Sequence, residues 1–307
     1  MQKLPVDLKG SGYLIFLSML LASNQIAIKV GNQGFDPVFM AAARSLIGLL
    51  ALLVWMYFRN LLVFPLKTNF IPGFFLGFFF AMEFWCLFRS LDYTSVARAS
   101  IIFYSMPVWL ALIAHFVLPN ERLNFNRILG LALAIAGVFI TVSSPNTGLS
   151  EKYFLGDILA LLAAFLWALI ALTVRISTLA NERAETQLFF QLAISLPILL
   201  ALSNLSPTFL REPNLSHLIS LSYQGICVAA FGFLLWFWLV KKYSASGVAS
   251  FAFLTPVFSV LLANITLNEA IESSIFLALI LVSIGLYLIN KRNSKTCLLY
   301  TSPSPRD

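Results

Sequence analysis

The pattern SMPVWLALIAHFVLPNERL at residues 105–123 returns at residues 255–271 as TPVFSVLLANITLNEAI. Each copy has a proline near its start, then an apolar run, a short polar exit and a glutamate. The two glutamates, Glu121 and Glu269, are 148 residues apart. The chain therefore contains one apolar unit twice.

Other residues repeat at nearly the same offset. Gly137 and Gly285 are also 148 residues apart, whereas Pro107 and Pro256 are 149 apart, so the alignment needs one single-residue gap. Internal duplication in an apolar chain is typical of secondary transporters, whose two repeats form the substrate site between them. Transport is therefore the first hypothesis.

Composition identifies the class of protein. Hydrophobic residues make up 60% of the 307 and charged residues only 11%, against about 25% charged residues in soluble domains. The apolar residues fall in blocks of about 20, which is long enough for a helix to cross a bilayer. We expect an all-α polytopic membrane protein with about ten spans. The expected spans are residues 12–32, 36–58, 70–91, 95–118, 124–143, 156–176, 186–206, 218–241, 245–265 and 272–290.

The spans divide into two halves of five. We expect a first repeat over residues 1–143, a loop over 144–155, a second repeat over 156–292, and a disordered or non-native tail over 293–307. Because five is an odd number, the two repeats begin on opposite sides of the membrane, which makes them inverted repeats.

Basic residues are distributed unequally between the two sides. Of the 20 lysines and arginines, 14 fall on the side of the N-terminus in this arrangement, five fall on the other side, and Arg44 lies within a span. Positive residues collect on the cytoplasmic side, so we expect both termini in the cytoplasm. The net charge of +7 thus reports topology, and no nucleic-acid partner is expected.

Motifs for cofactors, metals or catalysis are missing from the sequence. The three cysteines form no CxxC pair, and the two histidines are too far apart for a metal site. No GxxxxGK[ST] loop is present, which disfavours transport driven by ATP. We expect no cofactor, no metal and no enzymatic activity.

Two ionisable residues, Arg44 and Glu83, lie deep inside expected spans. Each costs about 2.5–3.5 kcal/mol on insertion scales, so each needs an explanation. Both lie about eight residues from the end of their span, or about 12 Å deep at 1.5 Å per residue. Other polar side chains on the first and fourth spans reach similar depth: Asn24, Gln25, Tyr104 and Ser105.

This convergence has two interpretations. In the first, the residues line a central cavity, where Arg44 pairs with Glu83 or binds a substrate carboxylate and Glu83 carries a coupling proton. In the second, Arg44 and Glu83 form a buried ion pair or a polar network that only fixes the positions of the helices.

Further candidates come from deep aromatic residues and from an amide. Trp85, Trp167 and Trp236 would suit an amphipathic or aromatic substrate, although packing explains them equally well. Gln191 would line an inner vestibule or form an interhelical hydrogen bond.

Backbone features suggest motion and packing. Pro107 and Pro256 interrupt matching spans, and each predicts a hinge or kink, either mobile or static. Gly73, Gly77 and Ala81 form a stripe of small residues suited to close helix packing, within the chain or in a homodimer.

Several of these segments carry a family resemblance. The pattern ARASIIFYSMPVW (97–109), the NERL turn (120–123) and the matching helices at 129–141 and 277–289 resemble the EamA-type transporters of the drug/metabolite transporter superfamily. The likeness covers residues 10–292. The second half departs from the pattern with NEAI after the proline-containing span.

The resemblance implies an inner-membrane carrier of small metabolites, often amino acids or related compounds. We expect a secondary active transporter, an exporter, working by alternating access as a monomer or homodimer in the lipid bilayer. A lipid-headgroup or polyprenyl-carrier translocase of the same fold is the main alternative; an intramembrane enzyme and a non-transport protein are others. We expect Glu121 and Glu269 to cap the helix turns that follow them rather than to bind substrate.

Overall fold

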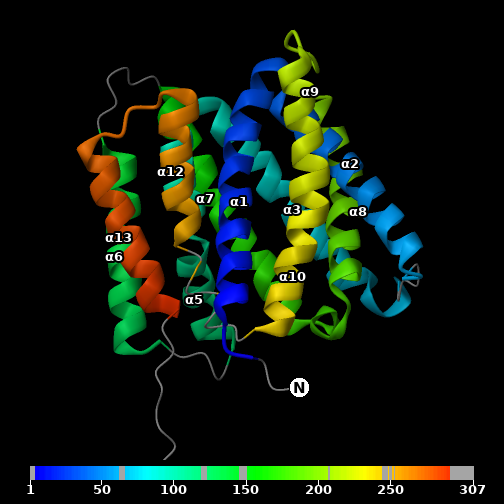
Figure 1. Cartoon of the computed structure of the whole chain (residues 1–307), viewed down its shortest axis with the longest axis horizontal. Helices are drawn as coiled ribbons and strands as arrows, with labels where there is room; N and C mark the ends of the chain where they lie inside the picture. Colours follow the sequence, from blue (N-terminus) through cyan, green and yellow to red (C-terminus); the bar gives the residue numbers. More distant parts are fainter. Residues whose placement is uncertain are drawn as a thin grey trace, which may run out of the picture.

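The computed structural model describes residues 4–61, 66–118, 123–144, 151–206, 208–243, 248, 251 and 253–290. These residues form helices and two isolated β-bridges, with no strand among them. Figure 1 shows the long helices running roughly along one direction.

The helices have the following bounds: α1 Leu8–Gly34, α2 Pro37–Phe58, α3 Leu66–Tyr93, α4 Val96–Phe103, α5 Met106–Val117, α6 Phe125–Ser143, α7 Glu151–Ile176, η1 Thr178–Asn181, α8 Ala184–Ser203, α9 Leu215–Ser222, η2 Tyr223–Gly232, α10 Phe233–Lys242, α12 Leu254–Leu267 and α13 Ser273–Asn290. Polar residues begin several of them. Asp7 accepts the N–H of Gly10 at 2.7 Å, and Asp36 accepts that of Val38 at 2.9 Å. Such caps satisfy N–H groups that the first helical turn leaves free.

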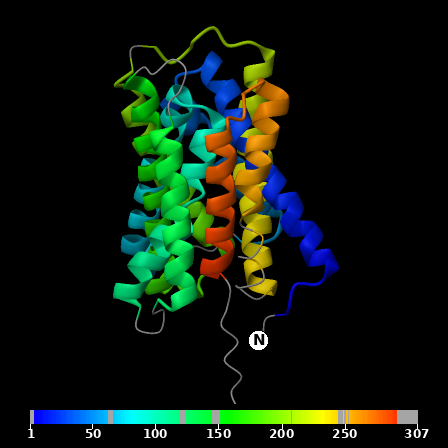
Figure 2. The ribbon, with the colours of Figure 1, turned by 90° about the vertical axis from the view of Figure 1, so that its left-hand side faces the viewer.

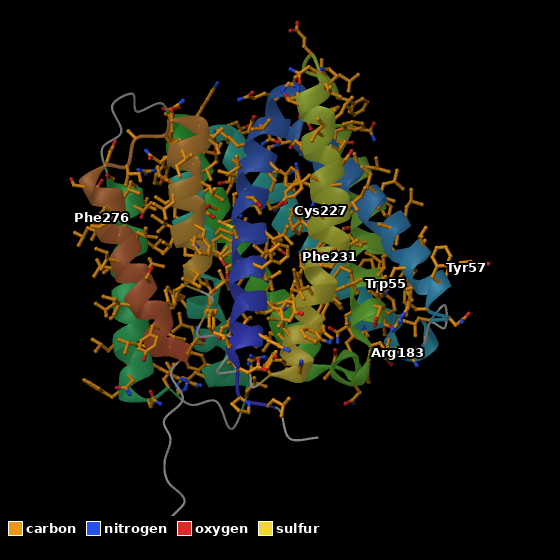
Figure 3. The ribbon with its side chains drawn as sticks, in the orientation of Figure 1. Trp55, Tyr57, Arg183, Cys227, Phe231 and Phe276 are labelled. Atoms are coloured by element: carbon orange, nitrogen blue, oxygen red, sulfur yellow. The ribbon has the colours of Figure 1, made fainter. Side chains whose placement is uncertain are left out.

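Nine helical stretches in the described residues are long and apolar enough to cross a membrane, with α4 and α5 forming one of them and α9, η2 and α10 another. The expected span at 245–265 is described mainly from residue 253, where α12 forms a shorter apolar helix of 14 residues. Large apolar side chains such as Trp55, Phe231 and Phe276 lie exposed on the outside of the bundle (Figure 3). The prediction of an all-α polytopic membrane protein is confirmed.

The order of the helices gives each repeat a direction. We call the end of the bundle where α1 begins the proximal end and the end where α1 finishes the distal end (Figures 1 and 2). Five crossings carry the chain from the start of α1 to the distal end of α6, so α7 begins at the distal end. The second repeat therefore starts on the opposite side from the first.

The last helices of the two repeats, α6 and α13, pack against each other at one edge of the bundle (Figure 1). A Cβ atom on Gly130 would come within 2.7 Å of the carbonyl oxygen of Gly285, and one on Gly137 within 2.8 Å of the carbonyl oxygen of Ala278. Gly137 corresponds to Gly285 between the repeats, and Gly130 to Ala278. Each contact is therefore the counterpart of the other, as in an interface with two-fold symmetry.

In each repeat, a helix begins just before the proline of the matching span. α4 ends at Phe103, and α5 begins at Met106 with Pro107 in its first turn, where a proline is tolerated because the N–H it lacks would be free. In the second repeat, α12 begins at Leu254, two residues before Pro256. The two helices thus begin at matching positions, and the idea that these positions act as hinges remains a prediction.

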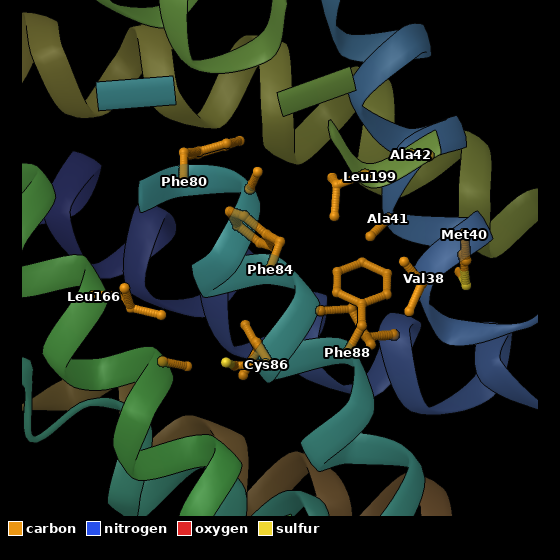
Figure 4. Close-up of a cluster of buried hydrophobic side chains, with 14 of the residues drawn as sticks. Val38, Met40, Ala41, Ala42, Phe80, Phe84, Cys86, Phe88, Leu166 and Leu199 are labelled. Carbon is orange, nitrogen blue, oxygen red and sulfur yellow. The ribbon is translucent and has the colours of Figure 1, made fainter. Parts of the chain in front are cut away.

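An apolar core joins the two repeats. Figure 4 shows part of it, with Phe80, Phe84 and Phe88 from α3, Val38 and Ala41 from α2, Leu166 from α7 and Leu199 from α8. The small residues of α3 contribute, since a Cβ atom on Gly73 would meet the Phe190 ring at 2.4 Å and one on Gly77 the Phe190 carbonyl at 2.6 Å. The stripe on α3 is therefore used for packing within the chain, against α8.

Candidate functional site

Arg44 is the most deeply buried charged side chain of the site, with an exposed fraction of 0%. Its guanidinium carbon lies 4.0 Å from the centroid of the Phe84 ring on α3. None of its three nitrogens has a hydrogen-bond partner. A guanidinium carries five N–H donors, and the ring face attracts its charge without using them. These donors are therefore free to bind an anionic group.

Glu83 precedes Phe84, the residue on α3 that Arg44 contacts. The side chains of Glu83 and Arg44 are close enough to interact electrostatically, yet they form no hydrogen bond or ion pair with each other. Glu83 is also buried, with 4% of its surface exposed. The structure thus brings the predicted cation and acid together without the direct pair that one interpretation required.

Tyr104 connects this cluster to α1. Its hydroxyl donates to the carbonyl of Leu21 at 3.2 Å, and the side chain of Gln25 lies next to it. Gln25 is 1% exposed, and its Oε1 atom has no hydrogen-bond partner. A free acceptor is therefore present on α1 beside Tyr104.

Asn24 adds a second unpartnered amide oxygen, its Oδ1 atom. It lies on the same face of α1 as Gly31, seven residues on, and Gly31 packs against Met40 of α2. Asn24 therefore lies on the face of α1 that meets α2 nearer the distal end.

Measured along the helices, these residues share a layer. Asn24, Arg44, Glu83 and Tyr104 are seven to ten residues from the distal ends of their helices, or about 10–15 Å at 1.5 Å per residue. The four residues thus share one depth in the bundle, and their convergence on a common cavity remains a prediction.

Ser105 lies at the break between α4 and α5. Its hydroxyl donates to the carbonyl of Ile102 at 2.6 Å, so its hydrogen is already used within the turn. Its position fits the predicted layer, but its donor is not free.

Two of the predicted tryptophans lie near the central core. The Trp167 ring stacks on Phe103, with centroids 4.9 Å apart, and meets Tyr104 edge-on at 6.0 Å. Trp85 is partly buried against the same core. Trp167 therefore forms an aromatic wall next to the polar cluster.

The other two candidates lie elsewhere. Gln191 has an unpartnered Oε1 atom, but Phe190 beside it packs against Gly73 and Gly77. Gln191 is thus about 9 Å or more from the level of Glu83, at 1.5 Å per residue of α3. Trp236 packs in a separate cluster with Leu14 and Leu17 of α1.

The sequence reasoning missed Gln224. It lies in η2, a π-helix that packs against α2, where a Cβ atom on the next residue, Gly225, would lie 3.4 Å from the carbonyl oxygen of Arg44. Its Oε1 atom is buried and unpartnered, while its amide donates to Ser220 at 3.2 Å. A glutamine inside the apolar run 218–241 was the available signal. π-helical turns often occur at functional sites.

Glu269 differs from expectation. Its carboxylate accepts the backbone N–H groups of Val96 at 2.8 Å and Ala97 at 3.0 Å. It therefore caps the start of α4 in the other repeat, rather than the turn that follows it. Its counterpart Glu121 lies outside the described residues. No group of three or more His, Cys, Asp or Glu residues suited to a metal occurs in the described part of the chain.

Known proteins place these features in a family. A family model described as "EamA-like transporter family" matches residues 8–143 and again residues 154–291. An "Uncharacterized transporter" of Archaeoglobus fulgidus is 26% identical over 90% of this chain and 95% of its own length. A "Probable amino-acid metabolite efflux pump" of Escherichia coli is 26% identical over 86% of this chain and 89% of its own.

A solved crystal structure shows the same fold, with a TM-score of 0.65 and 22% identity over 91% of this chain and 98% of its own. Names in the family point to transporters rather than enzymes. With the membrane-length helices, the inverted repeats and the two family matches together, the chain belongs to the EamA-like transporter family and is a multi-pass membrane protein.

Proposed function

We propose that this chain is a secondary active transporter that exports small metabolites, such as amino acids or related compounds, by alternating access between its two inverted repeats. The observation that carries the proposal is Arg44, a fully buried guanidinium with three unpartnered nitrogens. A charge with free donors inside a membrane protein is costly unless something binds it. A substrate carboxylate fits the planar fork of the guanidinium.

The surrounding groups complete a site for a substrate with two polar ends. The oxygens of Asn24 and Gln25 and the carboxylate of Glu83 accept hydrogen bonds, which suits an amino group on the same substrate. Trp167 and Phe103 offer a stacked aromatic surface for an apolar side chain. The Escherichia coli relative named as an amino-acid metabolite efflux pump supports this class of substrate.

Glu83 is our candidate for energy coupling. It is a buried carboxyl within reach of the charge of Arg44, so a substrate carboxylate that binds Arg44 changes the charge that faces Glu83. Binding of the substrate and loss or gain of a proton would thus be linked. The excess of basic residues near the proximal end supports an inner-membrane orientation with both termini in the cytoplasm.

The test is counterflow in proteoliposomes. Purified protein is reconstituted with unlabelled amino acids inside, and the entry of labelled amino acids is followed with and without an imposed proton gradient. The proposal predicts saturable counterflow of at least one amino acid, with a rate that responds to the gradient in the parent and not in Glu83→Gln. Failure of every amino acid, together with movement of labelled lipid between leaflets, would instead favour a translocase.

A further inference from the structure

The short helix α4 is a segment of the first repeat that the second repeat holds in place. It has eight residues, Val96–Phe103, and all of them are buried. It begins at the distal end and finishes at Tyr104, within the polar layer. A movement of α4 therefore affects both the distal end and the site.

Glu269 makes the first attachment. Its two carboxylate oxygens each accept one N–H group from the first turn of α4. Negative charge at this position is stabilised by the free N–H groups and the dipole of the helix. Asn268 precedes it in a left-handed conformation (φ 54°), and Asn264 donates to the Glu269 carbonyl at 2.9 Å. The end of α12 thus fixes the carboxylate against α4.

Asp157 makes the second attachment, from α7. Its carboxylate forms a buried ion pair with Arg98 of α4, in which Arg98 Nε lies 3.3 Å and 3.2 Å from the two oxygens. Thr94 donates to the same carboxylate at 2.9 Å. Gly156 lets the helices approach, because a Cβ atom there would lie 2.9 Å from Thr94.

The far end of α4 continues into the site. Phe103 stacks on Trp167, and the Tyr104 hydroxyl holds the Leu21 carbonyl of α1. Beyond Tyr104 the helix is broken before Pro107, so α4 is not continuous with α5. α4 is therefore a short helix that two acids fix at its distal end and that the turn at Tyr104 and Ser105 separates from α5.

We infer that Glu269 and Asp157 form a clamp that closes the distal end of the transporter, and that release of α4 from this clamp is the step that opens that end to the site. The inference rests on the proposed alternating access. The clamp residues act through α4 and Tyr104, so they are positioning residues rather than substrate ligands. Both attachments join the first repeat to the second, which is where inverted repeats must separate.

The experiment measures access to α4 without any substrate. Ala99, which is 0% exposed, is changed to cysteine in a background where the three native cysteines are alanine. The rate of maleimide labelling is then measured on detergent-solubilised protein. Leu52→Cys, also 0% exposed and in the proximal half of α2, serves as the second reporter.

Glu269→Ala should raise the labelling rate of the Ala99 reporter several-fold and leave the Leu52 reporter unchanged. Glu269→Gln, which keeps an acceptor oxygen but not the charge, should give a smaller rise. The matched control is Glu272→Ala, which removes a nearby carboxylate that binds Ser144 and Ser274 but does not touch α4. Its labelling rate should equal that of the parent.

A second variant tests the ion pair. Changing Arg98 and Asp157 together to alanine removes the pair without leaving a buried charge behind. It should raise labelling at Ala99 as Glu269→Ala does. The clamp is disproved if both the Glu269→Ala and the double variant label at the parent rate, or if both reporters rise equally. Because the labelling experiment uses no solute, its result is independent of the counterflow assay. The clamp can therefore be supported while the proposed substrate class is disproved, or the clamp can be disproved while the substrate class is supported.

Discussion

The guanidinium of Arg44 lies over the ring of Phe84 at 4.0 Å, and not in an ion pair with the neighbouring carboxyl of Glu83. A buried cation–π contact contributes about 2 kcal/mol and leaves the N–H donors unused. A buried ion pair with Glu83 would have used up to two of them in a bidentate contact. Because Arg44 contacts Phe84 rather than Glu83, its N–H donors are available to a ligand. An ion pair with Glu83 would instead have given Arg44 the role of joining two helices.

Packing of the two repeats can be tested at Gly285. A Cβ atom there would come within 2.6 Å of the Gly130 carbonyl and 2.8 Å of the backbone nitrogen of Ala134, neither of which can move alone. Gly285→Ala should lower stability by about 1–3 kcal/mol through overpacking. Thermal unfolding in detergent measures this as a fall in apparent Tm.

The control for Gly285 is Gly12→Ala in α1, where nothing lies within 4 Å of an added Cβ atom. This change should stabilise the helix by about 0.5–1 kcal/mol, because alanine loses less backbone entropy than glycine. Equal Tm values for the two variants would contradict the close packing of α6 on α13.

The stability that the hydrogen bonds of Asp7 provide at the proximal end should depend on pH. The N–H of Gly10 and then the hydroxyl of Tyr243, which donates at 2.8 Å, hold the pKa of Asp7 below its ordinary value. A lowered pKa gives stability that is present above the unfolded pKa, about 3.9, and is lost as pH falls through the folded value. Asp7→Ala should therefore have a lower apparent Tm than the parent at pH 7.

At pH 3 the difference between Asp7→Ala and the parent should shrink, because the parent's carboxyl is then being protonated. Tyr243→Phe should lower the Tm at pH 7 in the parent but not in Asp7→Ala. An unchanged gap between parent and Asp7→Ala from pH 7 to pH 3 would be inconsistent with this assignment.

The break before Pro107 gives a prediction about motion. Pro107→Ala removes a ring that costs about 3 kcal/mol inside a helix, so α4 can join α5. We expect the transport rate to fall several-fold while the apparent Tm stays equal or rises. Pro197→Ala, in the interior of α8, is the control and should transport at the parent rate. A parent-like transport rate in Pro107→Ala would contradict a role of this helix break in transport.

Much of the fold could be predicted because membrane spans are long and apolar. The offset between Gly137 and Gly285 indicated the duplication, and the helix ends differ from the predicted ones by a few residues in most spans. The break at Ser105 and the π-helix at Tyr223–Gly232 were harder to predict from the sequence. The proline indicated the first, but the second depends on contacts with α1 and α2 that no local pattern records.

For the candidate site, the sequence allowed only the depth of its residues along the spans to be predicted. Counting residues from the span ends placed Arg44 and Glu83 in one layer, but the choice of Phe84 as the partner of Arg44 depends on helix rotation. Glu269 shows the same limit. Its turn could be read from the sequence, whereas the helix that it caps, α4, comes from the other repeat.

The most direct measurement is counterflow by Arg44→Ala beside Arg59→Ala. Arg59 caps the exposed proximal end of the same helix, with its guanidinium 5.5 Å from the Trp55 ring. A hydrogen bond to a charged group is worth about 1.5–3 kcal/mol, so Arg44→Ala should reduce kcat/KM by at least about 10-fold. Arg59→Ala should transport like the parent. Equal counterflow by the two variants, at equal amounts of protein in the membrane, would contradict the role of Arg44 in binding substrate.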